Sequence, residues 1–361
     1  MKNVTLTLAA SLLLSTTAAV AEEVRVYNWS DYIDEDLLTK FEEETGIDLI
    51  YDVFDSNEVL ETKMLSGGSG YDVVVPTADF LSRQIVAGAF QPLDTSKLPN
   101  LENMWSVIED RTAQYDPDNA YSINYMWGTT GLGLNVGKVK AALGDDAPMN
   151  SMDLVLKPEN MEKLAECGVY FLDAPTEVIP MVLKYLGEDP DSNDPEVIGK
   201  AEETLMAVRP YIKKFHSSEY INALANGDIC VAVGWSGDVL QARDRAAEAD
   251  NGVEIAYNAF NEGSLMWFDQ MAIPVDAPNP EAAHIFLNFI MDAQNMAAAS
   301  NYVYFANGNE ASQEFLVEDV IGDTAIYPDE ETVKNLYTKS PYDSKVQRVV
   351  TRLWTKVKSG T

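Results

Sequence analysis

Apolar and polar residues along the first part of the chain predict strands and helices in turn. A strand is predicted at 24–29 (VRVYNW), where apolar residues recur at alternate positions, and three acidic residues open a helix over 34–45. A strand at 47–54, a helix around Leu60 and a buried strand at 73–75 follow. This β-α-β-α-β order predicts an α/β domain with a mostly parallel sheet.

The same alternation starts again after Gly128 and predicts a second α/β unit. Two stretches rich in Asp, Pro and Asn, 116–119 and 189–195, are typical of surface loops. The chain after residue 21 is longer than one hydrophobic core usually serves, so we expect two domains. The predicted elements of the second unit are helix KPENMEKLAE, strand GVYFLD, helix TEVIPMVLKYL and strand CVAVGW.

The last predicted helix, 344–358, is amphipathic. Its apolar residues fall on one stripe and its basic residues on the other. Binding to a membrane surface is one use of such a helix, but docking of the apolar stripe on a core is the more common one. We therefore expect this helix to dock its apolar stripe on a core.

The first 21 residues have the pattern of a signal peptide. Lys2 precedes a short apolar run, and Ala19-Val20-Ala21 forms a small-residue cleavage site. A membrane anchor is the alternative, but Ser15 to Thr17 interrupt the run well before the ~20 apolar residues that a span needs. We predict export, a mature chain that starts at Glu22 and a location in the periplasm.

Charge limits the choice of partner. The formal net charge is −33, and a chain this acidic lacks the basic surface that phosphate binding needs, so we expect no nucleic-acid partner. A hydrated acidic surface accounts for most of these charges. The two cysteines, Cys167 and Cys230, form either a disulfide or two free thiols; a metal site is disfavoured because His216 and His284 show no ligand spacing with them.

Sequence motifs of catalysis are incomplete. Gly131-Leu132-Gly133 lacks the third glycine of a dinucleotide loop, and Gly137-Lys138 lacks the earlier glycine of a phosphate loop. The segment GWSGD at 234–238 departs from the nucleophile elbow at its fifth position. We expect no cofactor, no metal and no catalysis.

Aromatic residues recur beside carboxylates near the ends of predicted strands. Three such segments are WSDY at 29–32, WSGD at 235–238 and WFD at 267–269. Ligands of open α/β sheets bind outside the carboxyl ends of strands, so these segments are expected to meet at one cleft. Taken singly, a Trp at a strand end is more often part of core packing, and an Asp after a turn is more often a helix N-cap or a solvated loop residue, so the prediction depends on the three segments together.

A diamine fits this combination. Its ammonium groups stay charged and need acceptors, and its methylene chain needs dry walls, which indole faces provide together with cation–π attraction. We assign Asp238 and Asp269 to one ammonium, and Glu177 and Asp31 to the other.

At these residues the chain resembles the polyamine-binding periplasmic components of ABC transporters, and most closely the putrescine-binding branch. The resemblance covers essentially the whole mature chain and is carried by long ordered motifs. Among them are YNWSDYI, YDVFDSNEVLE, FQPLDTSKLPN, YMWGTTGLGLN, CGVYFLDAP, FHSSEYIN and LANGDICVAVGWSGDV.

The resemblance implies a type II periplasmic binding fold, in which two α/β lobes close on a ligand about a hinge. We place lobe 1 at 22–127 plus about 258–306, and lobe 2 at about 128–257 plus 307–361. It also implies a disulfide between Cys167 and Cys230, a monomer, and a membrane permease as partner. The implied ligand residues are Trp29, Ser30, Asp31, Tyr32, Thr77, Asp79, Glu177, Trp235, Asp238, Trp267, Asp269 and Phe305.

Four of these residues depart from the putrescine-binding pattern. Thr77 stands for a serine, Asp79 adds a carboxylate, Trp267 replaces a phenylalanine and Phe305 replaces a tyrosine. They leave the choice among putrescine, cadaverine, spermidine and agmatine open. Two alternatives also remain: a binding protein for ferric iron, with Tyr302 and Tyr304 as ligands, and a carbohydrate-active enzyme with Trp platforms and two carboxylates.

Overall fold

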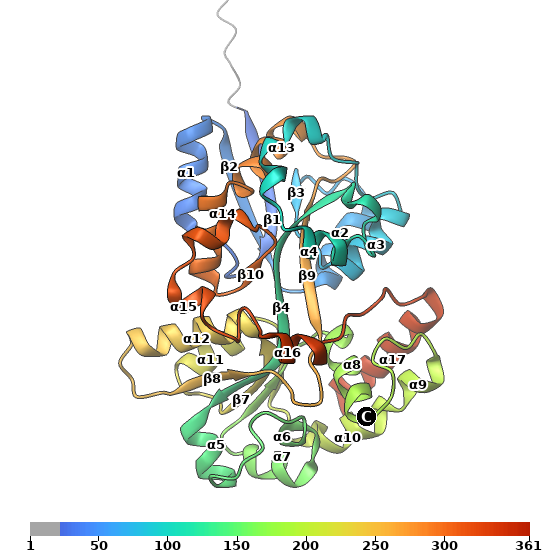
Figure 1. The fold of residues 1–361 in the computed structure, drawn as a ribbon. Coiled ribbons are helices and arrows are strands. Elements are labelled where there is room, and N and C mark those ends of the chain that lie inside the picture. Colours follow the sequence, from blue (N-terminus) through green and yellow to red (C-terminus); the bar gives the residue numbers. More distant parts are fainter. Residues whose placement is uncertain (1–21) are drawn as a thin grey trace, which may run out of the picture.

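A single path of paired strands connects the two halves of the protein in the computed structural model, which describes residues 22–361 (Figure 1). The strand order is β2-β1-β3-β9-β4-β7-β5-β6, and β8 and β10 also pair with β4. The predicted signal peptide, 1–21, lies outside the described residues. The strands are β1 Glu23–Trp29, β2 Asp48–Phe54, β3 Val73–Val74, β4 Ser122–Asn135, β5 Val169–Phe171, β6 Lys214–Phe215, β7 Val231–Trp235, β8 Ile255–Asn258, β9 Met266–Ala272 and β10 Ala306–Asn307.

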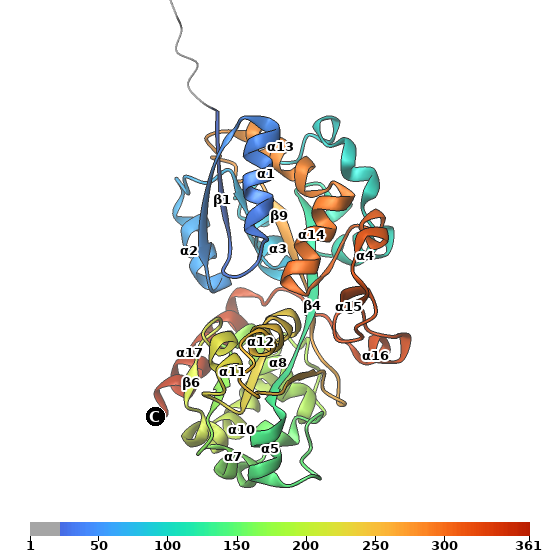
Figure 2. The same ribbon diagram turned by 90° about the vertical axis from the view of Figure 1, so that its left-hand side faces the viewer.

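Strand β4 belongs to both lobes. Its residues are buried throughout; Ser122 to Thr129 pair with β9, and Thr130 to Asn135 pair with β7 and β8. Figures 1 and 2 both show β4 running from the upper lobe, which holds the first residues, into the lower lobe. The lobe limits given above stay a prediction. Within β4 the pairing changes from β9 to β7 between Thr129 and Thr130, close to the predicted limit at 127/128.

The upper lobe contains the β-α-β-α-β unit expected from the sequence. Strand β1 pairs in parallel with β2 and β3, whereas β9 is antiparallel to both β3 and β4. The prediction of a mostly parallel sheet therefore holds for β1 to β3 and is wrong for β4 and β9, which cross between the lobes in opposite directions. The helices of this lobe are α1 Glu35–Thr45, α2 Asn57–Ser66, α3 Ala78–Val86, α4 Ser106–Thr112, α13 Pro280–Ile290 and α14 Ala293–Val303, with 3-10 helices at Thr95–Lys97, Pro99–Asn103 and Pro117–Asn119.

Helix α1 shows how the local sequence sets the limits of an element. The Asp34 side chain accepts a hydrogen bond from the Asp36 backbone N–H at its start, and Gly46 ends it in the left-handed conformation at φ 70°. Leu37 and Phe41 are buried on one face of the helix. Both predicted ends are confirmed.

The lower lobe holds the second α/β unit, the disulfide and the C-terminal helix. Cys167 and Cys230 are bonded, as the resemblance implied. Helix α17 buries its apolar stripe, including Val350, Leu353 and Trp354, which confirms the expected docking on the core. The helices are α5 Val136–Leu143, α6 Asp153–Leu156, α7 Pro158–Leu164, α8 Pro175–Tyr185, α9 Pro195–Gly199, α10 Ala201–Val208, α11 Tyr220–Ala225, α12 Ser236–Glu248 and α17 Ser344–Ser359, with a 3-10 helix at Arg209–Tyr211.

Residues beyond β10 connect the lobes a further time. They form a 3-10 helix at Ala311–Phe315, α15 Glu318–Ile321 and α16 Glu330–Asn335, and then run to α17 (Figure 1). The buried apolar side chains form two clusters, one in the upper lobe and one that fills the lower lobe and extends to Ala78 and Ile108 of the upper lobe. Over residues 22–361, no helix combines the length and the hydrophobicity that a membrane crossing requires.

Candidate functional site

A cavity of about 30 Å³ lies where the strand ends of the upper lobe face the helix starts of the lower lobe. The lining comes from segments more than 200 positions apart in the sequence. The lining residues are Trp29, Ser30, Tyr32, Asp55, Thr77, Glu177, Ser217, Trp235, Asp238, Trp267, Asp269 and Phe305.

Secondary structure explains why three carboxylates reach this cavity. Glu177 lies in the first turn of α8, shortly after β5, and Asp238 lies in the first turn of α12, directly after β7. The positive end of each helix dipole favours an anion there. Asp269 is on β9 two positions from Trp267, so both side chains point to the same face of the sheet.

Hydroxyl groups hold all three carboxylates, and none of the three forms a salt bridge within residues 22–361. Each carboxylate is 5 to 8% exposed. Glu177 and Asp238 each keep one oxygen free of these hydrogen bonds, and both oxygens of Asp269 keep a further lone pair, so all three carboxylates can accept from a ligand. The hydrogen bonds are Thr130 Oγ1 to Glu177 Oε2 (2.5 Å), Tyr220 OH to Asp238 Oδ2 (2.6 Å), Tyr32 OH to Asp269 Oδ2 (2.8 Å) and Thr77 Oγ1 to Asp269 Oδ1 (2.7 Å).

Burial sets the charge of these groups. Loss of solvation raises the pKa of Glu177, Asp238 and Asp269 to about 7 in each case, and hydrogen bonds from the neighbouring hydroxyls only partly oppose the rise. Near neutral pH the cavity therefore holds carboxyls poised between their protonated and ionised forms. A cation bound among these carboxyls favours their ionised form, because it supplies an opposite charge and no salt bridge to them is present within residues 22–361.

Aromatic rings form the apolar walls. Trp235 of the lower lobe lies edge-on to Trp29, with ring centroids 5.6 Å apart, and 6.5 Å from Trp267. Phe305 lies 5.3 Å from Trp267 and 5.2 Å from Tyr32. These rings enclose the cavity from both lobes, and the carboxylates between them are buried.

A glycine makes room for one of these rings. A β-carbon on Gly237, the second residue of α12, would lie 2.5 Å from the Phe305 ring, so no side chain fits at this position. The motif WSGD therefore contributes a ring, a carboxylate and the space for a ring of the other lobe.

Ten of the twelve residues that the resemblance implied line this cavity, and Asp31 and Asp79 do not. Asp31 instead accepts a hydrogen bond from Arg245 Nη2 at 2.7 Å, and its backbone carbonyl accepts one from Gln241 Nε2 at 3.2 Å. Since Arg245 and Gln241 are on α12 of the lower lobe, these two contacts of Asp31 join the upper lobe to the lower lobe. In this structure the carboxylate of Asp31 is paired with an arginine, and its assignment to an ammonium stays a prediction.

Asp79 is paired with a cation of the protein. Its Oδ2 atom lies 2.8 Å from the Lys339 ammonium, and both side chains are buried. The pair is next to a second, smaller cavity beyond Thr77, Glu177 and Trp267. Asp79 as a direct ligand of the first cavity is therefore not supported.

Sequence reasoning missed two lining residues, Asp55 and Ser217. Asp55 directly follows β2, so the rule that placed ligands at the carboxyl ends of strands applied to it as well. Ser217 is in the motif FHSSEYIN and follows β6. Its hydroxyl is buried without a hydrogen-bond partner among the described residues, so it is free to accept from a ligand.

The residues of the iron alternative lie elsewhere. Tyr302 is half exposed, and Tyr304 caps the end of α14; neither lines the cavity. Within residues 22–361 no group of three or more His, Cys, Asp or Glu has the arrangement of a metal site.

Comparison with known proteins identifies the class. Residues 36–327 match the family model of bacterial extracellular solute-binding proteins, so the chain belongs to that family. Family membership confirms the prediction of a binding protein and excludes the carbohydrate-active enzyme.

Two individual relatives match this chain over nearly its whole length. The putrescine-binding periplasmic protein SpuD of Pseudomonas aeruginosa (strain UCBPP-PA14) is 53% identical over 98% of this chain and 97% of its own length. The putrescine-binding periplasmic protein PotF of Escherichia coli (strain K12) is 51% identical over 96% of this chain and 94% of its own.

A solved structure confirms the two-lobed fold. The spermidine/putrescine ABC transporter substrate-binding protein PotD of Streptococcus pneumoniae superposes with a TM-score of 0.75 at 31% identity. The match covers 94% of this chain and 99% of that one. The chain is similar to these proteins along nearly its whole length, which fits the type II periplasmic binding fold predicted from the motifs.

Proposed function

We propose that this protein binds a linear diamine, with putrescine as the first candidate, between its lobes. One observation carries the proposal: three buried carboxylates, Glu177, Asp238 and Asp269, face one narrow cavity without a cationic partner among the described residues. Burying unpaired carboxylates is costly, and a cationic ligand offsets that cost.

The shape and the walls of the cavity favour an unbranched aliphatic chain. Trp29, Trp235 and Trp267 offer faces that pack on methylene groups and attract a nearby ammonium, by about 2 kcal/mol or more in a desolvated site. Each ammonium carries three donors, and the carboxylate oxygens and the Ser217 hydroxyl supply acceptors. A sugar would instead need donors as well as acceptors around it.

Contacts between the lobes indicate how ligand binding would stabilise their closed arrangement. The Trp29–Trp235 contact joins the upper lobe to the end of β7, and the Asp31–Arg245 ion pair joins it to α12. A diamine between the lobes adds attraction across the same gap and stabilises their closed arrangement. Since the ion pair is about one-third exposed, we expect it to add little by itself.

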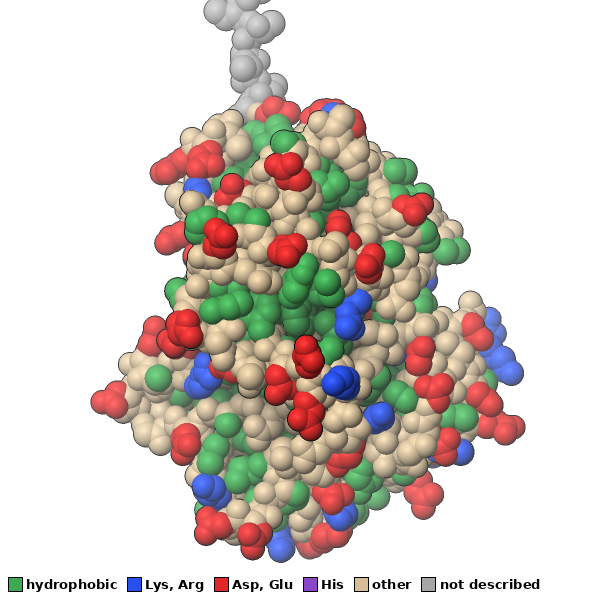
Figure 3. All heavy atoms as spheres, in the orientation of Figure 1, with side chains coloured by type: hydrophobic (Ala, Val, Ile, Leu, Met, Phe, Trp, Pro, Cys, Tyr) green, Lys and Arg blue, Asp and Glu red, His purple; other side chains and the backbone are tan. Residues whose placement is uncertain are grey.

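The names of the relatives also suggest where in the cell this protein acts and what receives its ligand. Both putrescine-binding relatives are named as periplasmic, and the solved relative is named as part of an ABC transporter. We infer that this chain is exported to the periplasm through its predicted signal peptide, acts as a monomer and passes its ligand to a transporter permease. The acidic surface in Figure 3, where carboxylates far outnumber basic groups, suits a soluble carrier that meets cations.

A thermal screen tests the ligand class. Since a ligand that binds only the folded state raises the melting temperature, we expect putrescine to raise it strongly at millimolar concentration and glucose to leave it unchanged. Cadaverine, agmatine and spermidine, measured in parallel, rank the amines. A shift with glucose, or no shift with any of the four amines, would overturn the proposed ligand class.

A further inference from the structure

A second cavity, of about 20 Å³, adjoins the ligand cavity. The two share Thr77, Glu177 and Trp267, and the second one ends at the buried pair of Asp79 and Lys339. The shared residues form the partition between the two spaces. A ligand longer than the first cavity would therefore extend toward Asp79.

The ammonium of Lys339 has the surroundings expected for an ammonium of a ligand. Its side chain is 3% exposed, and its Nζ atom donates to Asp79 Oδ2 at 2.8 Å and to the Ser340 carbonyl at 2.9 Å. The ring centroid of Tyr342 lies 4.1 Å from the same atom, within cation–π range. A carboxylate, a carbonyl and an aromatic face thus surround one cation.

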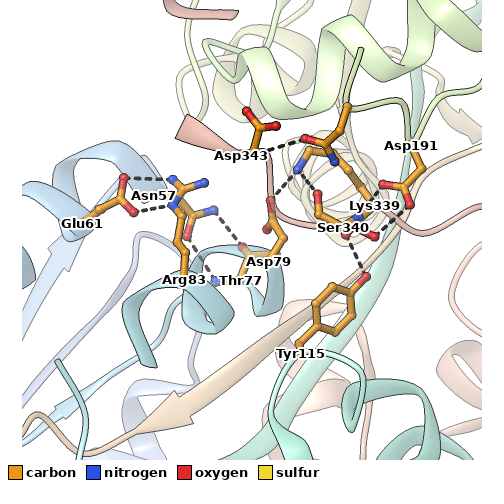
Figure 4. Close-up of polar contacts among 11 residues, drawn as sticks. Asn57, Glu61, Thr77, Asp79, Arg83, Tyr115, Asp191, Lys339, Ser340 and Asp343 are labelled. Atoms are coloured by element: carbon orange, nitrogen blue, oxygen red, sulfur yellow. Dashed lines mark hydrogen bonds and ion pairs between the residues drawn. The ribbon is translucent and has the colours of Figure 1, made fainter. Parts of the chain in front are cut away.

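Backbone anchors hold the lysine in this place. The Asp191 carboxylate accepts from the Ser340 backbone N–H at 2.5 Å and from its hydroxyl at 2.8 Å. The Tyr115 hydroxyl donates to the Lys339 carbonyl at 2.9 Å. Figure 4 shows Lys339 between these anchors and Asp79, which projects from the start of α3 in the upper lobe. The lysine therefore reaches across from the segment before α17 to the other lobe.

We propose that Lys339 is a specificity-determining residue that limits the length of the polyamine. Its ammonium takes the position and the carboxylate that a further amino group of a triamine would use. A triamine would have to displace a hydrogen-bonded buried cation or place a second cation beside it, and like charges repel strongly in such surroundings. This inference rests on the proposed function of the neighbouring cavity.

Replacing the lysine by an uncharged side chain tests the proposal. In Lys339→Met, the Asp79 carboxylate is left for the ligand, so we expect the affinity for spermidine relative to putrescine to rise by roughly 10- to 100-fold, the usual effect of a hydrogen bond to a charged group. Calorimetric titration of the parent and the variant with both amines measures the ratio. In Lys339→Met/Asp79→Asn, which lacks the carboxylate, the gain should disappear.

The possible outcomes separate this inference from the proposed function. If the parent binds no diamine, the proposed function fails; if it binds putrescine and Lys339→Met leaves the spermidine-to-putrescine ratio unchanged, only the role of Lys339 fails. Lys339→Gln, which keeps a hydrogen-bond donor for Asp79, replaces the Met variant if the latter does not unfold cooperatively. The parent itself supplies a further test, because equally tight binding of spermidine and putrescine would overturn the proposal without any variant.

Discussion

Asp269→Asn is expected to weaken putrescine binding by roughly 100- to 5,000-fold. The substitution keeps the shape of the side chain but removes the charge that faces a buried ammonium, and loss of one partner of a buried ion pair costs about 3–5 kcal/mol. Tyr32 OH and Thr77 Oγ1 each donate to one oxygen of Asp269, so in the variant one of the two hydroxyls must turn to accept from the amide NH₂. Calorimetric titration with putrescine measures the loss.

Asp146→Asn is the matched control. Asp146 is exposed in a turn of the lower lobe, and its substitution changes the net charge by the same amount. We expect its affinity to equal that of the parent. Unchanged putrescine affinity in Asp269→Asn would show that this residue does not bind the ligand. An equal loss of affinity in both variants would mean that the net negative charge of the protein, and not Asp269 in particular, attracts the ligand.

The same variant should have the opposite effect on stability. The pKa of Asp269 is about 7 in the folded protein, above its value in an unfolded chain, so ionisation destabilises the folded state above pH 7 and this penalty fades as the pH falls below 7. We therefore expect the melting temperature of ligand-free Asp269→Asn at pH 8 to be no lower than that of the parent. A marked drop would mean that the carboxylate is mainly structural.

Putrescine affinity is expected to fall by roughly 10- to 1,000-fold between pH 8 and pH 6. The carboxyls of Glu177, Asp238 and Asp269 have pKa values of about 7 and must ionise to pair with a cation, which costs about tenfold in affinity over this range for each carboxyl involved. The amines, with pKa values near 10.4, stay charged throughout. Titrations at several pH values measure the slope.

Proton release provides an independent reading of the same linkage. At pH 7 each carboxyl that ionises on binding releases about half a proton, and titrations in buffers with different ionisation enthalpies detect it. Affinity that does not change between pH 8 and pH 6, with no proton exchange, would mean that the carboxyls are already ionised or do not meet the ligand.

Local patterns predicted the parts of the site that follow directly from strand ends. Trp29, Glu177 and Asp238 stand at the ends of β1, β5 and β7 or in the helix that follows, and such positions meet at one edge of a sheet. The same rule covers Asp55, which directly follows Phe54 at the end of β2 and which the sequence analysis did not single out.

The partners of Asp31 and Asp79 could not be predicted from the sequence. Asp31 pairs with Arg245 at a separation of 214 residues, and Asp79 pairs with Lys339 at a separation of 260. Whether a carboxylate faces a ligand or a protein cation depends on which distant segment packs against it, and neither cation stands in a pattern that indicates this. The antiparallel crossing of β4 and β9 depends on long-range pairing in the same way.

Titrating the mature protein with three molecules of similar length tests the central claim most directly, namely that paired charges in a dry cavity capture the ligand. Putrescine should bind with one molecule per chain, 1-aminobutane should bind far more weakly, and butane-1,4-diol should not bind measurably. Binding of the diol as tight as that of putrescine, or no saturable binding of putrescine at millimolar concentration, would contradict it.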